Sequence, residues 1–258
     1  MVTASDFKVF PVENASRDSA RKYLLSKHAY LCIDAGHAIF LDLRKDKYIG
    51  LDPERSKRIS SIVQGWPAEF SNSTDELGRQ NASPDVLVQP LIDRGLITSD
   101  FQSGKDATPV KLENPHDEIG ADTWRGDRSI GLGDLLQFLT SVLSAFLQLR
   151  LWPIEKTVER VHSLRQRRPS CDKPSKESLA RSVAAFVRLR PLLFTSCDHC
   201  LFECLALINF LARKQIYPTW VFAVHSSPFG AHCWLQVDSV VLNDTLENVQ
   251  NFTPIMKV

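Results

Sequence analysis

The sequence lacks an excess of charge of either sign. Its 31 Lys and Arg residues are balanced by 30 Asp and Glu residues, so the formal net charge is +1. A chain with this balance has no broad basic surface to attract nucleic acid or an anionic membrane. We therefore expect neither of them among its partners.

The first residues also lack the pattern of an export signal. The segment "MVTASDFKVFPVEN" contains no basic stretch followed by an apolar run, which a secretory signal peptide requires. We therefore expect a cytoplasmic protein. In a reducing compartment the six cysteines, at positions 32, 171, 197, 200, 204 and 233, are expected as thiols, some of them with catalytic or metal-binding roles.

An uninterrupted membrane-spanning run is absent as well. Residues 129–152 approach the necessary length, but Asp134, Gln137, Gln148 and Arg150 interrupt them. The large apolar residues recur at three- and four-residue intervals, which predicts a helix with one side packed against a core. On the predicted buried stripe are Leu135, Phe138, Leu139, Val142, Phe146 and Leu149, and off it are Thr140, Ser141 and Ser144.

The hydrophobic content of 43% and the charged content of 24% are typical of a globular chain. Residues 29–52 predict three short strands, "YLCID", "AIFLDL" and "KYIGL", separated by turns. A helix is then predicted with Asp52 as its N-cap and Pro53 in its first turn. A further helix is predicted over 83–97, with Gly95 at its end.

Two domains are expected. Residues 101–128 are polar, with Gly and Pro scattered through them, which predicts a linker between domains at 1–100 and 129–258. In the second domain helices come first, and the strands "TWVFAVHS" and "HCWLQVDSVVLND" follow. This order predicts the α+β class.

A candidate nucleophile lies in "TSCDHCLFECLALINFLARK". Its apolar residues have helical spacing and Ser196 or Asp198 is a suitable N-cap, so Cys200 is expected in the first helical turn. The unpaired N–H groups and the helix dipole favour the thiolate there, and the thiolate is the nucleophilic form. Cys197 lies before or at the cap and is the second choice.

His232 and Asp244 are the candidates for a general base and for the group that orients it. A strand that starts near His232 and turns at Asp238-Ser239 would be followed by a strand that returns Asp244 to the imidazole. The carboxylate would then fix the tautomer of the ring. The spacing alone leaves a packing role and a catalytic role open for Cys200, His232 and Asp244.

A zinc site is the competing interpretation. Cys197 and Cys200 have the spacing of a zinc knuckle. No second Cys-x-x-Cys or His-x-x-x-His pair completes the set, so we expect no metal and no cofactor. The pool of possible ligands is Cys197, His199, Cys200, Cys204, His225, His232 and Cys233.

The segments "CLFECLALINFLARKQIYP" and "FGAHCWLQVDSVVLND" together resemble a known family, the leader peptidase (B protein) of bacterial lasso peptide biosynthesis. The resemblance implies a transglutaminase-like (papain-like) cysteine protease domain with Cys200 as nucleophile, His232 as base and Asp244 as orienting carboxylate. The matching residues are Cys200, Leu201, Leu205, Ala206, Leu207, Phe229, Ala231, His232, Trp234 and Asp244.

Residues 37–66 are similar to the precursor-recognition element of the same family, a small winged-helix-like domain. The resemblance implies that the partner is the leader segment of a ribosomally made precursor peptide. We expect the leader to add a strand along the edge "KYIGL", with Tyr48 and Ile49 as contacts, although alternation makes one of the two a core residue. It also implies an ATP-dependent, asparagine-synthetase-like cyclase that acts on the cleaved product.

Cys233 departs from the small residue that this family has after the motif histidine. Strand alternation predicts that its side chain faces away from the site, so we expect no catalytic consequence. Two other functions stay open: a peptide-binding scaffold without catalysis, and transfer of the acyl group to an amine, as transglutaminases do.

Overall fold

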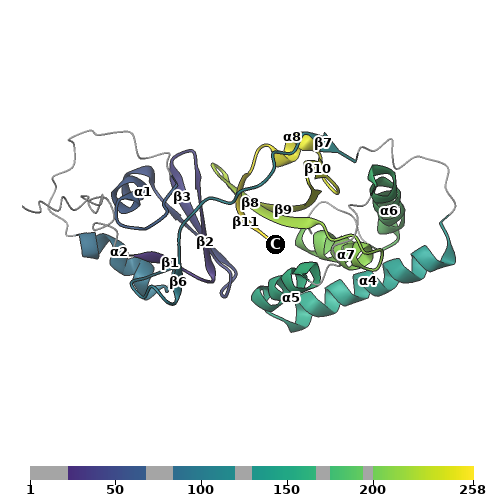
Figure 1. Cartoon of the computed structure of the whole chain (residues 1–258), viewed down its shortest axis with the longest axis horizontal. Helices are drawn as coiled ribbons and strands as arrows, with labels where there is room; N and C mark the ends of the chain where they lie inside the picture. The colour runs from purple at the N-terminus through teal and green to yellow at the C-terminus, as the bar shows by residue number, and fades with distance from the viewer. Residues whose placement is uncertain (1–22, 68–83, 120–129, 167–174, 194–199) are drawn as a thin grey trace, which may run out of the picture.

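The structure, a computed structural model, describes residues 23–67, 84–119, 130–166, 175–193 and 200–258 (Figure 1). Helices and strands occur in both halves of the chain, so the mixed α+β class predicted from the sequence is confirmed. In Figure 1 the N-terminal sheets and helices lie on the left, and the C-terminal sheet with its helices lies on the right.

The N-terminal half is built on an antiparallel sheet of three strands in the order β2-β3-β4. These are the three predicted strands, and their bounds are Ala29–Asp34, His37–Asp42 and Lys47–Leu51. Gly36 has a φ of +81° in the turn between β2 and β3, a conformation that glycine adopts without steric cost. Asp46 has a φ of +52° just before β4, and aspartate is one of the few residues that tolerate this region.

Two helices and a second sheet accompany β2-β3-β4. The helix α1 (Pro53–Ser60) begins as predicted, because the Asp52 carboxylate accepts a hydrogen bond from the Arg55 N–H at 2.9 Å. The helix α2 (Pro84–Asp93) ends before Gly95, whose φ of +75° turns the chain. The second sheet has the order β5-β1-β6, with bounds Ile97–Thr98, Leu24–Ser26 and Gly104–Lys105.

Both faces of the sheet β2-β3-β4 are buried, in two different cores. Side chains alternate along a strand, and Leu31 and Phe40 pack on one face with residues of α1 and α2. Ile39 and Leu41 point to the opposite face and belong to the core of the C-terminal half. The sheet is therefore a layer that the two halves of the molecule share.

The C-terminal half contains a five-stranded sheet in the order β11-β8-β9-β10-β7. The strands β8 (Thr219–Ser226), β9 (Phe229–Val237) and β10 (Val240–Val241) follow each other along the chain, with the predicted turn between β9 and β10 at 238–239. The outer strands are β11 (Thr253–Lys257) and β7 (Asp117–Glu118).

Helices surround this sheet, and α7 contacts β9 as well as α4 and α6. Its buried residues include Leu205, Phe210 and Leu211, so α7 lies in the centre of the C-terminal core. The helices are α4 (Leu132–Leu151), α5 (Ile154–Gln166), α6 (Lys176–Leu189), the short 3-10 helix η2 (Arg190–Leu192), α7 (Cys200–Ala212) and α8 (Leu246–Val249).

The segment expected as a linker takes part in both sheets. Its strand β6 pairs with β1 in the N-terminal half, and β7 pairs in parallel with β10 in the C-terminal half. Between them, the Glu113 carbonyl accepts a hydrogen bond from the Gln236 side chain at 2.7 Å. The described part of this segment is therefore anchored at both of its ends.

The long helix α4 corrects the predicted buried stripe. Its buried residues include Ser141 and Gln148, whereas Leu139 and Phe146 are 40% and 56% exposed. On the buried side, Gln137 Nε2 also donates a hydrogen bond to the Phe210 carbonyl of α7 at 2.8 Å. Periodicity of apolar residues could not report that contact.

By length and composition alone, α4 is long and apolar enough to cross a membrane, a property that core helices of other proteins share. One side of it packs against α7, and the buried Phe138 ring lies edge-on to Phe186 at 5.4 Å between centroids. The other side carries several exposed apolar residues, among them Leu132, Leu136 and Leu143.

Asp34, at the end of β2, joins the two halves by hydrogen bonds. Its carboxylate accepts one from the Ser226 N–H of β8 at 2.7 Å and one from the Thr253 hydroxyl of β11 at 2.6 Å. Burial opposes ionisation, but these two bonds outweigh it and lower the pKa of the Asp34 carboxyl. The N-terminal sheet is thereby held against the strands of the C-terminal sheet.

Replacement Asp34→Ala should destabilise the protein by about 2–4 kcal/mol, because it removes two hydrogen bonds to a charged group, each worth about 1.5–3 kcal/mol, from a carboxylate that solvent partly reaches. The free energy of unfolding in urea measures this, with Asp34→Asn, which keeps an acceptor, as the milder control. The difference in unfolding free energy between wild type and Asp34→Ala should be complete above the ordinary carboxyl pKa of 3.8. It should decrease as the pH falls through the lowered pKa of Asp34 in the folded protein. Equal unfolding free energies for Asp34→Ala and wild type at pH 7 would contradict the link.

Candidate functional site

The helix α7 begins at Cys200, which places this thiol at the end of the helix where backbone N–H groups lack intrahelical partners. The helix forms here because its apolar residues fill the core: Leu205, Leu207 and Leu211 are fully buried. The other sequence candidates near this end, Cys197 with the caps Ser196 and Asp198, lie outside the described residues.

The strand β9 and the loop after β10 bring His232 and Asp244 together. The imidazole Nε2 and the Asp244 carboxylate are directly hydrogen-bonded, although twelve positions separate them in sequence. The contact leaves Nδ1 as the nitrogen available to the thiol, and Cys200 lies close enough to His232 for each side chain to shift the pKa of the other. The structure therefore brings the three sequence candidates into one chain of contacts.

Asn248, on the short helix α8, is a polar neighbour that the sequence did not reveal. Its side-chain amide donates hydrogen bonds to both oxygens of the Asp244 carboxylate, at 3.0 and 3.1 Å. The backbone N–H of Thr245 donates to the same carboxylate at 2.8 Å. These donors fix the orientation of the carboxylate that holds His232. The sequence "NDTLEN" could have predicted a short helix after the strand, because it offers Asn, Asp and Thr as N-cap residues.

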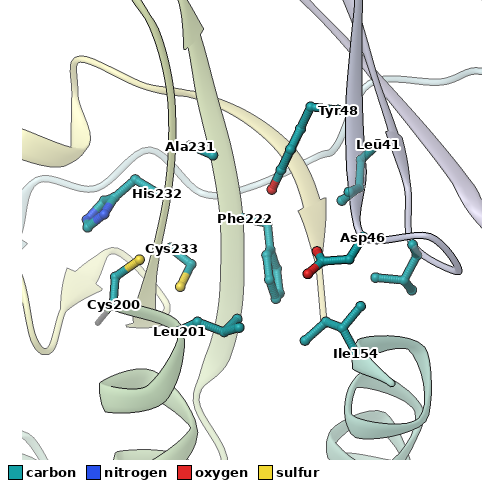
Figure 2. Close-up of a pocket in the computed structure, with 11 residues that line it drawn as sticks. Leu41, Asp46, Tyr48, Ile154, Cys200, Leu201, Phe222, Ala231, His232 and Cys233 are labelled. Carbon is teal, nitrogen blue, oxygen red and sulfur yellow. The ribbon is translucent and has the colours of Figure 1, made fainter. Parts of the chain in front are cut away.

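The expectation that Cys233 faces away from the site was wrong. His232 and Cys233 do lie on opposite faces of β9, but α7 packs against the face that carries Cys233. The Cys233 sulfur consequently lies beside the Cys200 thiol, whose pKa it raises, and 3.8 Å from the Cys204 sulfur. Figure 2 shows the Cys200 sulfur between the imidazole and the Cys233 side chain.

The pKa values of this chain of groups depend on each other. The hydrogen bond with Cys233, together with burial, raises the pKa of Cys200 to about 12, while the neighbouring His232 opposes the rise. Burial opposes protonation of His232, but Asp244 and Cys200 raise its pKa to about 9. The two groups therefore titrate as a coupled pair, in which the imidazolium favours the thiolate and the thiolate favours the imidazolium.

A cavity of about 150 Å³ opens beside these groups. Its walls come from both halves of the chain, as Figure 2 shows. The N-terminal sheet contributes part of the lining and the C-terminal domain contributes the rest. The lining residues are Leu41, Leu43, Asp46, Tyr48, Ile154, Cys200, Leu201, Phe222, Ala231, His232 and Cys233.

Tyr48 and Ile49, the candidate peptide contacts, point to opposite faces of β4. Tyr48 lines the cavity, and its ring lies 5.6 Å from the ring of Phe229 between centroids. Burial raises the pKa of its hydroxyl, which keeps it protonated. Ile49 packs against the N-terminal core. The strand β4 itself pairs only with β3 among the described residues, so its outer edge is available.

Glu203 is a buried acid near the nucleophile that sequence reasoning missed. It lies one turn into α7 and is 3% exposed, and its carboxylate accepts a hydrogen bond from Arg190 at 2.8 Å. Burial raises the pKa of Glu203 and Arg190 opposes the rise. A buried ion pair of this kind holds the start of α7 against η2 and so positions Cys200.

Within the ranges that the structure describes, no group of three or more His, Cys, Asp and Glu side chains is arranged to hold a metal ion. Two members of the ligand pool, Cys197 and His199, lie outside those ranges. Of the others, Cys200, His232 and Cys233 line one cavity.

A model of the transglutaminase-like superfamily matches residues 143–257. The matched range contains Cys200, His232 and Asp244, and cysteine-dependent enzymes are typical of the superfamily. No curated protein and no solved structure matches the chain. The C-terminal part of the chain is therefore a transglutaminase-like domain.

Replacement Cys233→Ala should lower the pKa of Cys200, because it removes the hydrogen bond that contributes most to the raised value. Alkylation of Cys200 by iodoacetamide, followed by mass spectrometry from pH 6 to 10, measures the shift. At neutral pH the rate should rise by about tenfold for each unit by which the pKa falls. The control Cys233→Ser keeps a hydrogen-bonding group and should stay near wild type; an unchanged profile in Cys233→Ala would refute the assignment.

Proposed function

Starting from the transglutaminase-like domain at residues 143–257, we propose that the protein is a cysteine peptidase that removes the leader segment of a ribosomally made precursor peptide, as in lasso peptide biosynthesis. The observation that carries the proposal is the contact chain of Cys200, His232 and Asp244 at the start of a helix and beside a cavity. Acyl transfer to a thiol requires a nucleophile, a general base and a group that orients the base, and these three residues can supply them.

The proposed reaction begins when the Cys200 thiol gives its proton to the His232 imidazole, which leaves a thiolate beside an imidazolium. The sulfur attacks the carbonyl carbon of the leader–core bond, and backbone N–H groups at the start of α7 stabilise the oxyanion. The imidazolium gives its proton to the departing amine as the C–N bond breaks. Imidazole then takes a proton from water, which hydrolyses the thioester and frees the leader.

Asp244 acts on His232 rather than on the substrate. Its contact with Nε2 directs Nδ1 toward the thiol and stabilises the imidazolium that forms. Asn248 keeps the carboxylate in this orientation through two hydrogen bonds. Asn248 is thus a positioning residue for the base.

We further propose that residues 1–100 form a winged-helix-like recognition element that captures the leader as an added strand on β4. The outer edge of β4 supports this, because an unpaired strand edge offers main-chain donors and acceptors to a peptide. Tyr48, near the start of β4, lines the cavity beside Cys200. A leader antiparallel to β4 would therefore advance with its C-terminal end toward the thiol.

The resemblance to the lasso peptide leader peptidase also implies a partner enzyme that acts after cleavage. The cleaved core has a new N-terminal amine, which an ATP-dependent, asparagine-synthetase-like cyclase would join to a side-chain carboxylate. Peptide capture on β4 raises the local concentration of the scissile bond at Cys200 without any contact to that cyclase.

Replacement Cys200→Ala should abolish precursor cleavage and leave leader affinity within about twofold, because the thiol is the nucleophile and lies outside the β4 edge. Cleavage is followed by mass spectrometry and affinity by fluorescence anisotropy of a labelled leader. The neighbouring Cys204→Ala is the matched control and should keep cleavage. Cleavage by Cys200→Ala would end the peptidase proposal, and cleavage by neither variant nor wild type would favour a binding scaffold.

Replacement Tyr48→Ala should weaken leader binding and slow cleavage by about tenfold or more, because loss of a buried aromatic contact costs about 1.4 kcal/mol or more. Tyr48→Phe keeps the ring and should stay near wild type. Equal leader affinities for wild type and Tyr48→Ala would argue against capture beside this residue.

Acyl transfer is the second candidate, because the matched superfamily takes its name from transglutaminases. Both reactions form the same thioester on Cys200 and differ only in the acceptor. Mass spectrometry of the released leader in the presence of an added primary amine distinguishes a free carboxylate from an amide.

A further inference from the structure

The cavity beside Cys200 has an acidic residue in its lining that takes no part in the proposed peptidase reaction. Asp46, from the turn before β4, is one of its lining residues, and Figure 2 shows the carboxylate directed across the cavity toward Phe222 and Ile154. Among the described residues no side chain forms an ion pair or a hydrogen bond with Asp46. It is also the one acid in a lining whose other members are mostly apolar.

Three cations lie next to Asp46 in sequence, and Lys47, one position before Tyr48 on β4, is directed to the opposite face of that strand from Tyr48. Arg44 lies 3.3 Å from the Glu155 carboxylate, and Lys45 lies 3.5 Å from the Asp42 carboxylate and 3.0 Å from the Arg94 carbonyl. None of the three lines the cavity. Asp46 is exposed to solvent at the rim of the cavity, and its carboxylate can therefore pair with a positive charge on a ligand that enters it.

The size and the walls of the cavity fit one extended side chain. The cavity has a volume of about 150 Å³. A space of that size can hold a ligand of about six heavy atoms. Leu41, Leu43 and Phe222 supply apolar surface for a methylene chain, and Asp46 supplies the counter-charge at its end. Long cationic side chains pair with their surroundings in this way, with stem on apolar surface and charged head at a polar group.

We infer that this cavity is a specificity subsite, shared by the two halves of the chain, that selects a lysine or arginine side chain on the substrate residue whose carbonyl Cys200 attacks. The inference rests on the proposed peptidase function. The N-terminal half then not only captures the peptide but also supplies the acidic determinant of the cleavage position.

The contact between the halves makes a shared subsite possible. Leu41 and Ile39 of the N-terminal sheet belong to the same core as α7 and β9, and Asp34 bonds to β8 and β11. Asp46 follows directly from that packed sheet. The buried contacts of the sheet therefore hold the turn that carries Asp46 on the side of the cavity opposite α7.

The test uses three probes that alkylate a cysteine in an occupied site: acetyl-Ala-Lys, acetyl-Ala-norleucine and acetyl-Ala-Glu chloromethyl ketones. The Cys200 sulfur displaces chloride and forms a thioether, which peptide mapping by mass spectrometry quantifies. Norleucine matches the length of lysine without its charge. Wild-type protein should react with the lysine probe about fivefold faster than with norleucine, and slowest with glutamate.

The variant Asp46→Asn should reduce the ratio of lysine to norleucine labelling to about one. Asparagine tolerates the positive φ of this position, so the turn should be kept. Asp93→Asn is the matched control, because it removes the same charge from an exposed site at the end of α2, where Asp93 contacts Gln89. It should keep the wild-type ratio.

The outcomes separate the subsite from the peptidase. Labelling of Cys200 at equal rates by lysine and norleucine, or a lysine preference that survives in Asp46→Asn, would overturn the subsite and leave the proposed function intact. If none of the three probes labels Cys200, both the subsite and the nucleophile are overturned. Loss of the preference in Asp46→Asn alone supports the subsite.

Discussion

The burial of both faces of the sheet β2-β3-β4 is the constraint on which the rest of the structure depends. One face needs α1 and α2, and the other needs the core around α7, so neither half can pack completely without the other. The hydrogen bonds of Asp34 reinforce the same contact. As a result the start of β4, with Tyr48, is held at the cavity beside Cys200.

The candidate catalytic groups depend on a second, smaller set of contacts. The β9–β10 hairpin returns the chain to His232, and the α8 turn places Asn248 against the Asp244 carboxylate. On the other side, Glu203 and Arg190 hold the start of α7. The thiol and the imidazole thus come from different elements, each positioned by its own polar partner, and this explains how distant residues acquire a common geometry.

Features with local causes were predicted from the sequence, and features that arise from tertiary packing were not. The strands over 29–52, the Asp52 cap and the turn at 238–239 follow from alternation and turn chemistry within a few residues. The exposure of Leu139 and Phe146 on α4 was missed because the spacing of apolar residues does not show which of them a neighbouring helix covers. The position of Cys233 was missed because alternation predicts a face of the strand but not which helix packs there. The cavity has no local signature, since its walls come from segments far apart in the chain.

The doubly covered sheet bears on how such a protein can be divided between genes. If the two halves were made as separate polypeptides, each would expose to water an apolar surface that is buried in the single chain. That surface lies around Ile39 and Leu41 in one half and around α7 in the other. Exposed surfaces of this kind aggregate. Two such polypeptides would have to be synthesised together and associate immediately, and fusion into one chain removes that requirement.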